Sequence, residues 1–423
     1  MRLWPDGWPE RKPERQGAAM SRPDTVEKRD EISDLMLEPM ELQMGPSHPA
    51  THGTIKFNLK LDGEKILECD VDVGYLHRGF EKSCEQVTWT QVVPYTDRLN
   101  YASPLINNFG YALAVEKLLG VETTPRCQYI RVIMSEIARI FDHLTCCGMG
   151  EAELGAITAG FYTIEARELL YRLIEKVCGA RLTVTYARIG GVKHDLPMNF
   201  AEEVKGAFSK IRRLMADCDH LLERNRIFLD RLCNVGVISQ ETAISYGLTG
   251  PNLRSTGVNY DVRKAFPYLV YDRMNFEVPV GTKGDNYDRF WCRMEEIEQS
   301  MRIVEQALGE IPPGPVMIDD PRIVLPEKEH VYGSIEGMMN HFKLIFEGIQ
   351  IPPGEVYKAV EGGNGEVGFY IVSDGGGRPY RVRVRQPSFI AMGAFGEIIK
   401  GYYVADIIPT FGMINMIGGE CDR

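Results

Sequence analysis

The sequence predicts an α+β protein, with a small N-terminal antiparallel β-sheet, a central helical bundle and a short C-terminal β-hairpin region. Three observations predict this class. Apolar and polar residues alternate between about residues 55 and 73, which is typical of strands that bury one face. Four later stretches repeat apolar residues every three or four positions, as amphipathic helices do. A second alternating stretch, from 367 to 384, surrounds a glycine-rich turn.

Four regions follow one another along the chain. Residues 1–34 are rich in Pro, Arg, Glu and Asp and have no apolar period, so we expect a disordered or loose tail without a signal sequence. Residues 35–80 form a small β domain, and 81–310 form the helical bundle. Residues 311–423 form a C-terminal α/β region that completes the bundle and its cavity.

The helical period is clear in four stretches of the bundle, and each stretch buries one stripe of side chains. Between about residues 249 and 285 no period holds, and a loop of this length inside a domain is typically functional or partner-binding. The four stripes are Ile130, Ile133, Ile137, Ile140 and Leu144; Leu170, Leu173, Ile174 and Val177; Val204, Phe208, Ile211, Met215, Cys218 and Leu222; and Trp291, Met294, Ile297, Met301, Val304 and Leu308.

Composition limits the possible functions. With 44% hydrophobic residues in 423, the chain has enough apolar material for a large core. Its net charge of -11 argues against a nucleic-acid partner, because binding to phosphates requires a basic face. There is no uninterrupted apolar run long enough to span a bilayer, so we expect any membrane role to come through a partner.

The ten cysteines are scattered and include no C-x-x-C pair. This pattern indicates free thiols in a reducing compartment. Adjacent Cys146 and Cys147 point to different helix faces, so a shared zinc or iron–sulfur site is not expected. We interpret every cysteine as a small buried hydrophobe.

Two turns hold the candidate reactive groups. His48 and His52 lie in Gly-Pro-Ser-His-Pro-Ala-Thr-His-Gly, just before the first predicted strand, and Tyr101 lies in Asp-Arg-Leu-Asn-Tyr-Ala-Ser. Turns of this composition present polar groups on loops, where binding residues are commonly found. The residues alone leave a second interpretation open, in which the histidines and the tyrosine have ordinary structural hydrogen bonds.

Several long motifs occur together in a fixed order from about residue 39 to residue 423: GPSHPATHG, GYLHRGFEK, YTDRLNYAS, GLTGPNLR and VPVGTKGDNYDR. In these motifs the chain resembles the 49 kDa or D subunit family of respiratory complex I, the proton-pumping NADH:quinone oxidoreductase. That family is related to the large subunit of [NiFe]-hydrogenase. The resemblance implies a helical bundle of hydrogenase-large-subunit type and a role in quinone reduction.

The resemblance also implies roles for residues of the two turns. In the family, the second histidine and the tyrosine bind the quinone headgroup, and these positions are His52 and Tyr101 here. Both residue types suit the task, because an imidazole delivers protons near neutral pH and a phenol donates to a developing oxyanion. His48 is expected to support the turn at the quinone site, and Ser103 to line the quinone slot.

An acidic partner for the histidine is implied in Gly-Glu-Ala-Glu-Leu-Gly-Ala, where the family commonly has aspartate. Glu153 is the matching position and is one methylene longer. A carboxylate beside an imidazole favours the charged ring. Glu151 is a rival for the same role.

Three arginines, Arg78, Arg98 and Arg188, match motifs that lie near the terminal [4Fe-4S] cluster of a partner subunit in the family. A nearby cation stabilises the reduced cluster. Thr183 stands where many members have a histidine, and threonine cannot take up a proton. We therefore expect a cluster potential with weak pH dependence, and a low-potential quinone such as menaquinone.

Hydrogenase large subunits hold nickel and iron with two C-x-x-C pairs. At the two corresponding places this chain has only Cys84 and Cys421. Single thiols cannot supply four thiolates, so we expect no metal site. In the quinone-reducing relatives, quinone occupies the vacated cavity.

The resemblance implies that no cofactor is held by this chain alone, and that NADH, FMN and the [4Fe-4S] cluster belong to partner subunits. The implied partners are the cluster-bearing B subunit, the C and I subunits and the membrane H subunit. The expected location is peripheral, on the cytoplasmic face of the bacterial inner membrane or on the matrix side in an organelle. Two alternatives stay open: a ferredoxin- or F420-linked quinone or phenazine oxidoreductase, and a purely structural scaffold.

Overall fold

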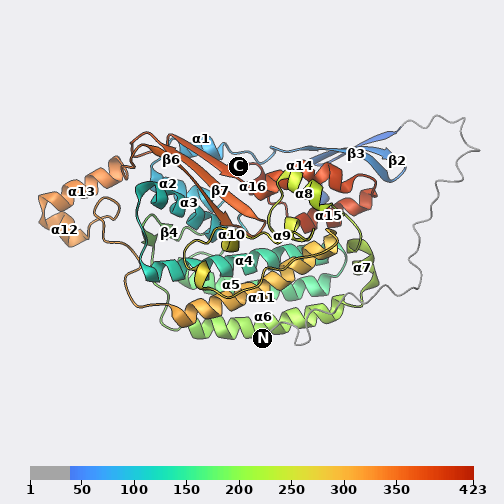
Figure 1. Cartoon of the computed structure of the whole chain (residues 1–423), viewed down its shortest axis with the longest axis horizontal. Helices are drawn as coiled ribbons and strands as arrows, with labels where there is room; N and C mark the ends of the chain where they lie inside the picture. The colour runs from blue at the N-terminus through green and yellow to red at the C-terminus, as the bar shows by residue number, and fades with distance from the viewer. Residues whose placement is uncertain (1–38) are drawn as a thin grey trace, which may run out of the picture.

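The computed structural model describes residues 39–423 (Figure 1), so the predicted tail at 1–34 lies outside the described residues. The predicted N-terminal hairpin is confirmed as β2 (Lys56–Asp62) and β3 (Lys65–Asp72), and β1 (Met40–Met44) pairs with β2 to give an antiparallel order β1-β2-β3. The register shifts at Lys60/Leu61. Because such a bulge reverses the alternation, Ile66 is buried and Leu67, which the alternation placed inward, is 37% exposed.

The bundle consists of long helices that lie alongside one another (Figure 1): α4 (Pro125–Glu153), α5 (Ile157–Cys178), α6 (Phe200–Leu222) and α11 (Asn286–Glu310). The predicted apolar stripes of α4, α5 and α6 are buried throughout; in that of α11, Trp291 and Leu308 are only partly buried. The helical bundle predicted from the period is therefore confirmed.

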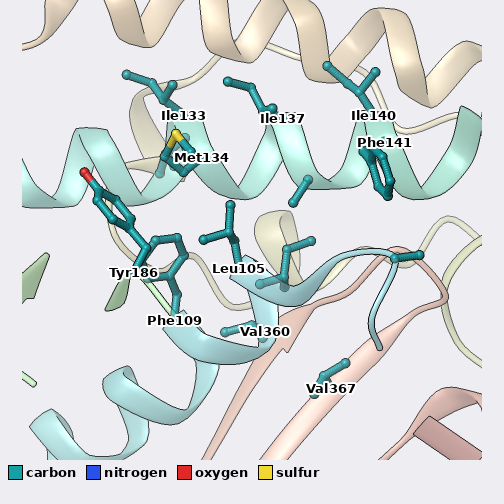
Figure 2. Close-up of a cluster of buried hydrophobic side chains, with 14 of the residues drawn as sticks. Leu105, Phe109, Ile133, Met134, Ile137, Ile140, Phe141, Tyr186, Val360 and Val367 are labelled. Atoms are coloured by element: carbon teal, nitrogen blue, oxygen red, sulfur yellow. The ribbon is translucent and has the colours of Figure 1, made fainter. Parts of the chain in front are cut away.

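Helix α4 lies at the centre of the core and is packed on both sides. In Figure 2, Ile133, Ile137 and Ile140 point toward α11, while Leu105 and Phe109 of α3 (Pro104–Leu119) lie on the opposite side of α4. All five side chains are buried. Burial on two sides explains why α4 has few exposed positions.

The C-terminal region contains a second antiparallel sheet. The predicted hairpin is confirmed as β7 (Glu366–Ser373) and β8 (Arg381–Arg385), and β6 (Gly354–Glu361) adds a third strand beside β7. Helices α14 (Pro387–Ile399), α15 (Ile407–Ile414) and α16 (Gly418–Cys421) follow. The remaining elements are α1 (Phe80–Cys84), α2 (Trp89–Thr96), β4 (Ala187–Arg188), β5 (Gly191–Val192), α7 (Arg226–Leu232), α8 (Gln240–Tyr246), α12 (Lys328–Gly333) and α13 (Ile335–Phe346), with short 3₁₀ turns at Pro49–Thr51, Tyr271–Arg273 and Val404–Asp406.

The irregular stretch at 249–285 contains the short helices α9 (Gly250–Arg254) and α10 (Val262–Ala265). It inserts two arginines into the core. Arg254 contacts Glu296 at 2.9 Å and Glu361 at 2.8 Å, and Arg263 contacts Glu296 at 2.7 Å. Burial alone raises the pKa of Glu296, but Arg254, His143 and Arg263 outweigh burial and hold that pKa well below its usual range. This stretch is thus tied into the bundle by buried charge.

The ten cysteines, which all lie within residues 39–423, are thiols outside any disulfide, as predicted. Seven are buried, and Cys69, Cys178 and Cys233 are partly buried. Burial raises the pKa of Cys146 to about 11, which keeps it protonated. Within residues 39–423, no helix has both the length and the apolar character that a membrane crossing requires.

Candidate functional site

The first histidine of the N-terminal turn serves the turn itself. The Nδ1 atom of His48 accepts a hydrogen bond from the Ala50 amide at 3.1 Å, at the start of the 3₁₀ turn Pro49–Thr51. The Thr51 hydroxyl donates to the carbonyl oxygens of Pro46 and His48, at 3.1 and 3.0 Å. These local bonds fix the path of the chain that leads to His52.

His52 follows this turn as its C-terminal cap, with φ near 53°, a left-handed conformation. Its Nε2 atom lies 3.2 Å from Oε1 of Glu153, the last residue of α4. The ring also meets Phe411 of α15 edge-on, with centroids 4.9 Å apart. The side chains of His52 and Glu153 are 39% and 20% exposed. The carboxylate therefore orients an imidazole that a ligand can reach.

Glu151, the rival acid, lies in a different environment two residues earlier in α4. Its side chain is fully buried, and the Cys218 thiol contacts Oε1 at 3.5 Å. Its Oε2 has no hydrogen-bond partner among residues 39–423. Burial raises the pKa of Glu151 to about 8. The structure thus brings Glu153, not Glu151, to His52.

The second turn presents Tyr101 with its side chain 40% exposed. Burial of part of the ring, followed by the carboxylates Asp142 and Glu420, raises the pKa of Tyr101, while a backbone hydrogen bond from Gly418 and the charge of Arg78 lower it. The net shift is upward, so the phenol stays a hydrogen-bond donor at neutral pH.

Ser103 lies behind Tyr101 and points into the protein. Its side chain is buried, and its hydroxyl donates to Oδ2 of Asp142 at 2.8 Å. Asn100 donates to the same oxygen at 2.8 Å, and its Oδ1 accepts from the Ala102 amide at 3.0 Å. Asp142 therefore organises the turn, with Ser103 as one of its supports.

Helix α16 joins the two turns. A Cβ on Gly418 would lie 3.0 Å from side-chain atoms of Thr54 and Leu76, and one on Gly419 would lie 2.5 Å from the carbonyl oxygen of Arg98. Only glycine fits such close contacts without displacing its neighbours. Gly418 thus contacts both the Tyr101 phenol and Thr54, which lies two residues after His52 in the sequence. Among the described residues, no direct hydrogen bond links His52 and Tyr101.

The arginines are brought together from distant parts of the sequence. Arg78 donates to the carbonyl oxygen of Arg98 at 2.8 Å, and Arg98 contacts Oδ1 of Asp97 at 2.7 Å. The other oxygen of Asp97 accepts from Thr185 at 3.2 Å. Arg188 lies on the same segment as Thr185, and burial lowers its pKa.

Thr183, on the same loop, is partly buried. Its neighbour on that loop, Thr185, is joined through Asp97 to the turn of Arg98. Thr183 therefore lies in a segment tied to the arginines.

Cys84 and Cys421 are both buried. Within residues 39–423, no group of three or more His, Cys, Asp or Glu side chains is arranged to hold a metal ion. A cleft of about 380 Å³ lies beside α16 and is lined by residues that include His77, Glu81 and Arg383. His52 and Tyr101 do not line this cleft, and the side chains of both are about two-fifths exposed.

Sequence reasoning missed three residues of the site: Phe411, Asp142 and Glu420. A signal for Asp142 existed, since it is a charged residue inside the otherwise apolar central helix. Glu420 and Phe411 gave no comparable signal, because their proximity to the turns arises only when α15 and α16 pack.

Comparisons with known proteins agree on one family. The model of the family described as "Respiratory-chain NADH dehydrogenase, 49 Kd subunit" matches residues 153–423. The chain is similar to a D subunit (D 1) of NADH-quinone oxidoreductase in Sorangium cellulosum, with 56% identity over 92% of this chain and 97% of that protein. It is also similar to the D subunit in Myxococcus xanthus, with 54% identity over 92% and 94%. The C/D subunit in Bdellovibrio bacteriovorus is 50% identical over 91% of this chain and 69% of that protein.

Proposed function

Since this chain belongs to the family of the 49 kDa subunit of respiratory-chain NADH dehydrogenase, we propose that it forms the quinone-headgroup side of the reduction chamber in a proton-translocating NADH:quinone oxidoreductase. It is a subunit of an oxidoreductase complex, as its relatives are. The observation that carries the finer proposal is the contact of the exposed His52 with Glu153 at 3.2 Å, with α16 packed against both Thr54, two residues after His52, and the exposed phenol of Tyr101.

These residues fit the needs of quinone reduction, in which two electrons and two protons are added. Tyr101 donates a hydrogen bond and then a proton at one quinone oxygen, and the imidazolium of His52 does the same at the other. Glu153, 3.2 Å from the ring, holds His52 in position for this transfer. His48 and Ser103 support the two turns from behind. The electrons come from a [4Fe-4S] cluster on a partner, toward which Arg78, Arg98 and Arg188 face.

The exposure of the site supports a role for partner subunits. His52 and Tyr101 are each about two-fifths exposed in this chain, whereas a quinone pocket is largely enclosed. Neighbouring cluster-bearing, I-type and membrane H-type subunits close the chamber, and this chain lies peripherally at the membrane. The C/D name of the Bdellovibrio relative supports a C-type subunit as a further neighbour.

The names of the relatives favour NADH over ferredoxin or F420 as the electron source. They also argue against a purely structural scaffold. Neither point concerns which quinone is used. Thr183, which stands where many family members have a histidine, favours a low-potential quinone.

The test is the quinone-reductase activity of the assembled complex with Tyr101→Phe. Removing one donated hydrogen bond from an enclosed site costs about 1 to 3 kcal/mol, roughly a ten- to hundredfold change in kcat or in the KM for quinone. The matched control is Tyr246→Phe, because Tyr246 is also 40% exposed but lies on α8. Kinetics unchanged by Tyr101→Phe in an assembled complex would contradict the proposed site.

A further inference from the structure

Two fully buried carboxylic side chains lie behind Tyr101. Asp142 of α4 accepts three hydrogen bonds from uncharged donors: Asn100 and Ser103 at 2.8 Å on one oxygen, and Asn415 at 2.9 Å on the other. Glu420 of α16 accepts two, from Asn364 at 3.0 Å and Ser388 at 2.8 Å, both on Oε2. Its other oxygen, Oε1, is buried and has no partner among residues 39–423.

A continuous chain of amides connects the two carboxyl groups. Asn415 donates to Asp142 and also to Oδ1 of Asn364, at 2.9 and 2.5 Å. Asn364 in turn donates to Glu420. These donors come from segments next to α4 that are far apart in the sequence. A buried polar network of this kind destabilises the fold unless every polar group in it has a hydrogen-bond partner. The unpartnered oxygen of Glu420 is the exception in this network.

Glu420 is close to Tyr101 through α16. Gly418, whose backbone hydrogen-bonds the Tyr101 phenol, is two residues before Glu420, and both carboxyl groups act on that phenol electrostatically. The titratable groups that face Glu420 are Asp142, Tyr101 and Cys421. Arg78 lies on the Gly419 side of α16; α14 and the loop at 362–365 contribute the uncharged Ser388 and Asn364.

The two carboxyl groups are solvated differently. Three donors are spread over both oxygens of Asp142, whereas the unpartnered oxygen of Glu420 is suited to hold a proton. Burial, reinforced by the charge of Asp142, raises the pKa of Glu420 to about 7. Glu420 therefore changes its protonation state near neutral pH, beside a tyrosine that we have proposed as a proton donor.

We propose that Glu420 is the proton store that refills Tyr101 during quinone reduction, an inference that rests on the proposed function. When Tyr101 protonates the reduced quinone, its phenolic O–H bond breaks and a new O–H bond forms on the quinone oxygen. The Glu420 proton then restores the phenol and leaves a carboxylate bonded by Asn364 and Ser388. The electrons are those of the proposed reaction, and a proton from the aqueous phase later reloads Glu420.

The first experiment is the pH profile of kcat for the assembled complex with Glu420→Gln. Glutamine keeps the shape and the hydrogen-bond acceptor but has no acidic proton, so we expect kcat to fall at least about tenfold with KM changed less than about twofold. We also expect the limb of the profile near neutral pH to disappear. The control is Glu355→Gln, which removes an exposed carboxylate on β6 and is expected to leave the profile unchanged. A wild-type rate and profile in Glu420→Gln would overturn the inference.

Two further measurements separate this role from a merely structural one. The infrared band of a protonated buried carboxylic acid should titrate near neutral pH in the wild-type complex, and its absence would overturn the inference even if Glu420→Gln fails to assemble. The double variant with Tyr101→Phe should be no slower than Tyr101→Phe alone, because both residues act in one proton path; additive losses would contradict this. An impaired Tyr101→Phe beside a normal Glu420→Gln rejects only this inference, whereas a normal Tyr101→Phe rejects the proposed function itself.

Discussion

At the scale of single residues, Glu151 and Glu153 show how environment assigns chemistry to identical side chains. Glu153 ends α4, keeps partial contact with solvent and pairs with His52. Glu151 is buried against Cys218 with one oxygen unpartnered. A helix turns by about 100° per residue, so a spacing of two places the side chains on different faces.

Glu151 predicts a pH dependence of local stability. Its folded-state pKa, about 8, lies above the ordinary value of 4.5, so its contribution to stability is fully present below the ordinary pKa and is lost as pH rises toward 8. We expect hydrogen-exchange protection at the end of α4 to weaken by about 2 to 4 kcal/mol between about pH 5 and pH 9.

Glu151→Gln should remove most of this dependence, because the amide does not ionise. The exposed carboxylate of Glu165 on the next helix provides the control substitution, Glu165→Gln. If Glu151→Gln and wild type lose protection equally, Glu151 is not the group responsible.

At the scale of elements, the irregular stretch at 249–285 is held by charge inside the bundle. Arg263 of α10 contacts Asp261 at 2.6 Å, Glu296 of α11 at 2.7 Å and Glu136 of α4 at 3.1 Å. Burial lowers the pKa of Arg263, but these carboxylates outweigh burial and keep it well above its usual value. A short helix of four residues gains its stability from such contacts, since local helix propensity is too weak at this length.

Arg263→Ala should therefore destabilise the chain by about 3 to 5 kcal/mol, because it leaves several buried carboxylates uncompensated. Arg322→Ala is the matched control: its pair with Asp320 measures 2.6 Å, but the arginine is 78% exposed. We expect Arg322→Ala to destabilise the chain by less than about 1 kcal/mol. Thermal unfolding and the yield of assembled complex measure the effect of each variant. Equal losses of stability in Arg263→Ala and Arg322→Ala would argue against the buried network as the anchor.

At the scale of the whole molecule, the chain gathers segments from the full length of the sequence around the proposed site. The His52 turn, the Tyr101 turn, the end of α4, α15 and α16 meet there, and the arginines lie on the adjoining loops. The site is open in this chain, which fits a protein that works inside a larger assembly. Its proposed electron donor belongs to a partner subunit.

Thr183 gives a prediction for that assembly. Without a titrating side chain at this position, the potential of the partner's cluster should change little with pH, while Thr183→His should add a slope approaching about 59 mV per pH unit. Redox titration of the complex at several pH values, followed by electron paramagnetic resonance, measures this. A wild-type slope already near the one-proton limit would contradict it.

The sequence by itself determined the elements and the candidate turns. Its periods of two and of three to four residues predicted the sheets and the bundle, since these follow from which faces of a strand or helix are buried, and its motifs singled out His52, Tyr101 and Glu153. Even so, the period was misleading at Leu67, where a bulge reverses the alternation.

Only the tertiary structure decided which of two glutamates faces His52, that the irregular 249–285 stretch is anchored in the core, and that Asp142 and Glu420 lie behind Tyr101. The physical reason is that solvation and charge act through space. A carboxyl group acquires its protonation state from neighbours that are hundreds of residues away in the chain and a few ångströms away in the fold.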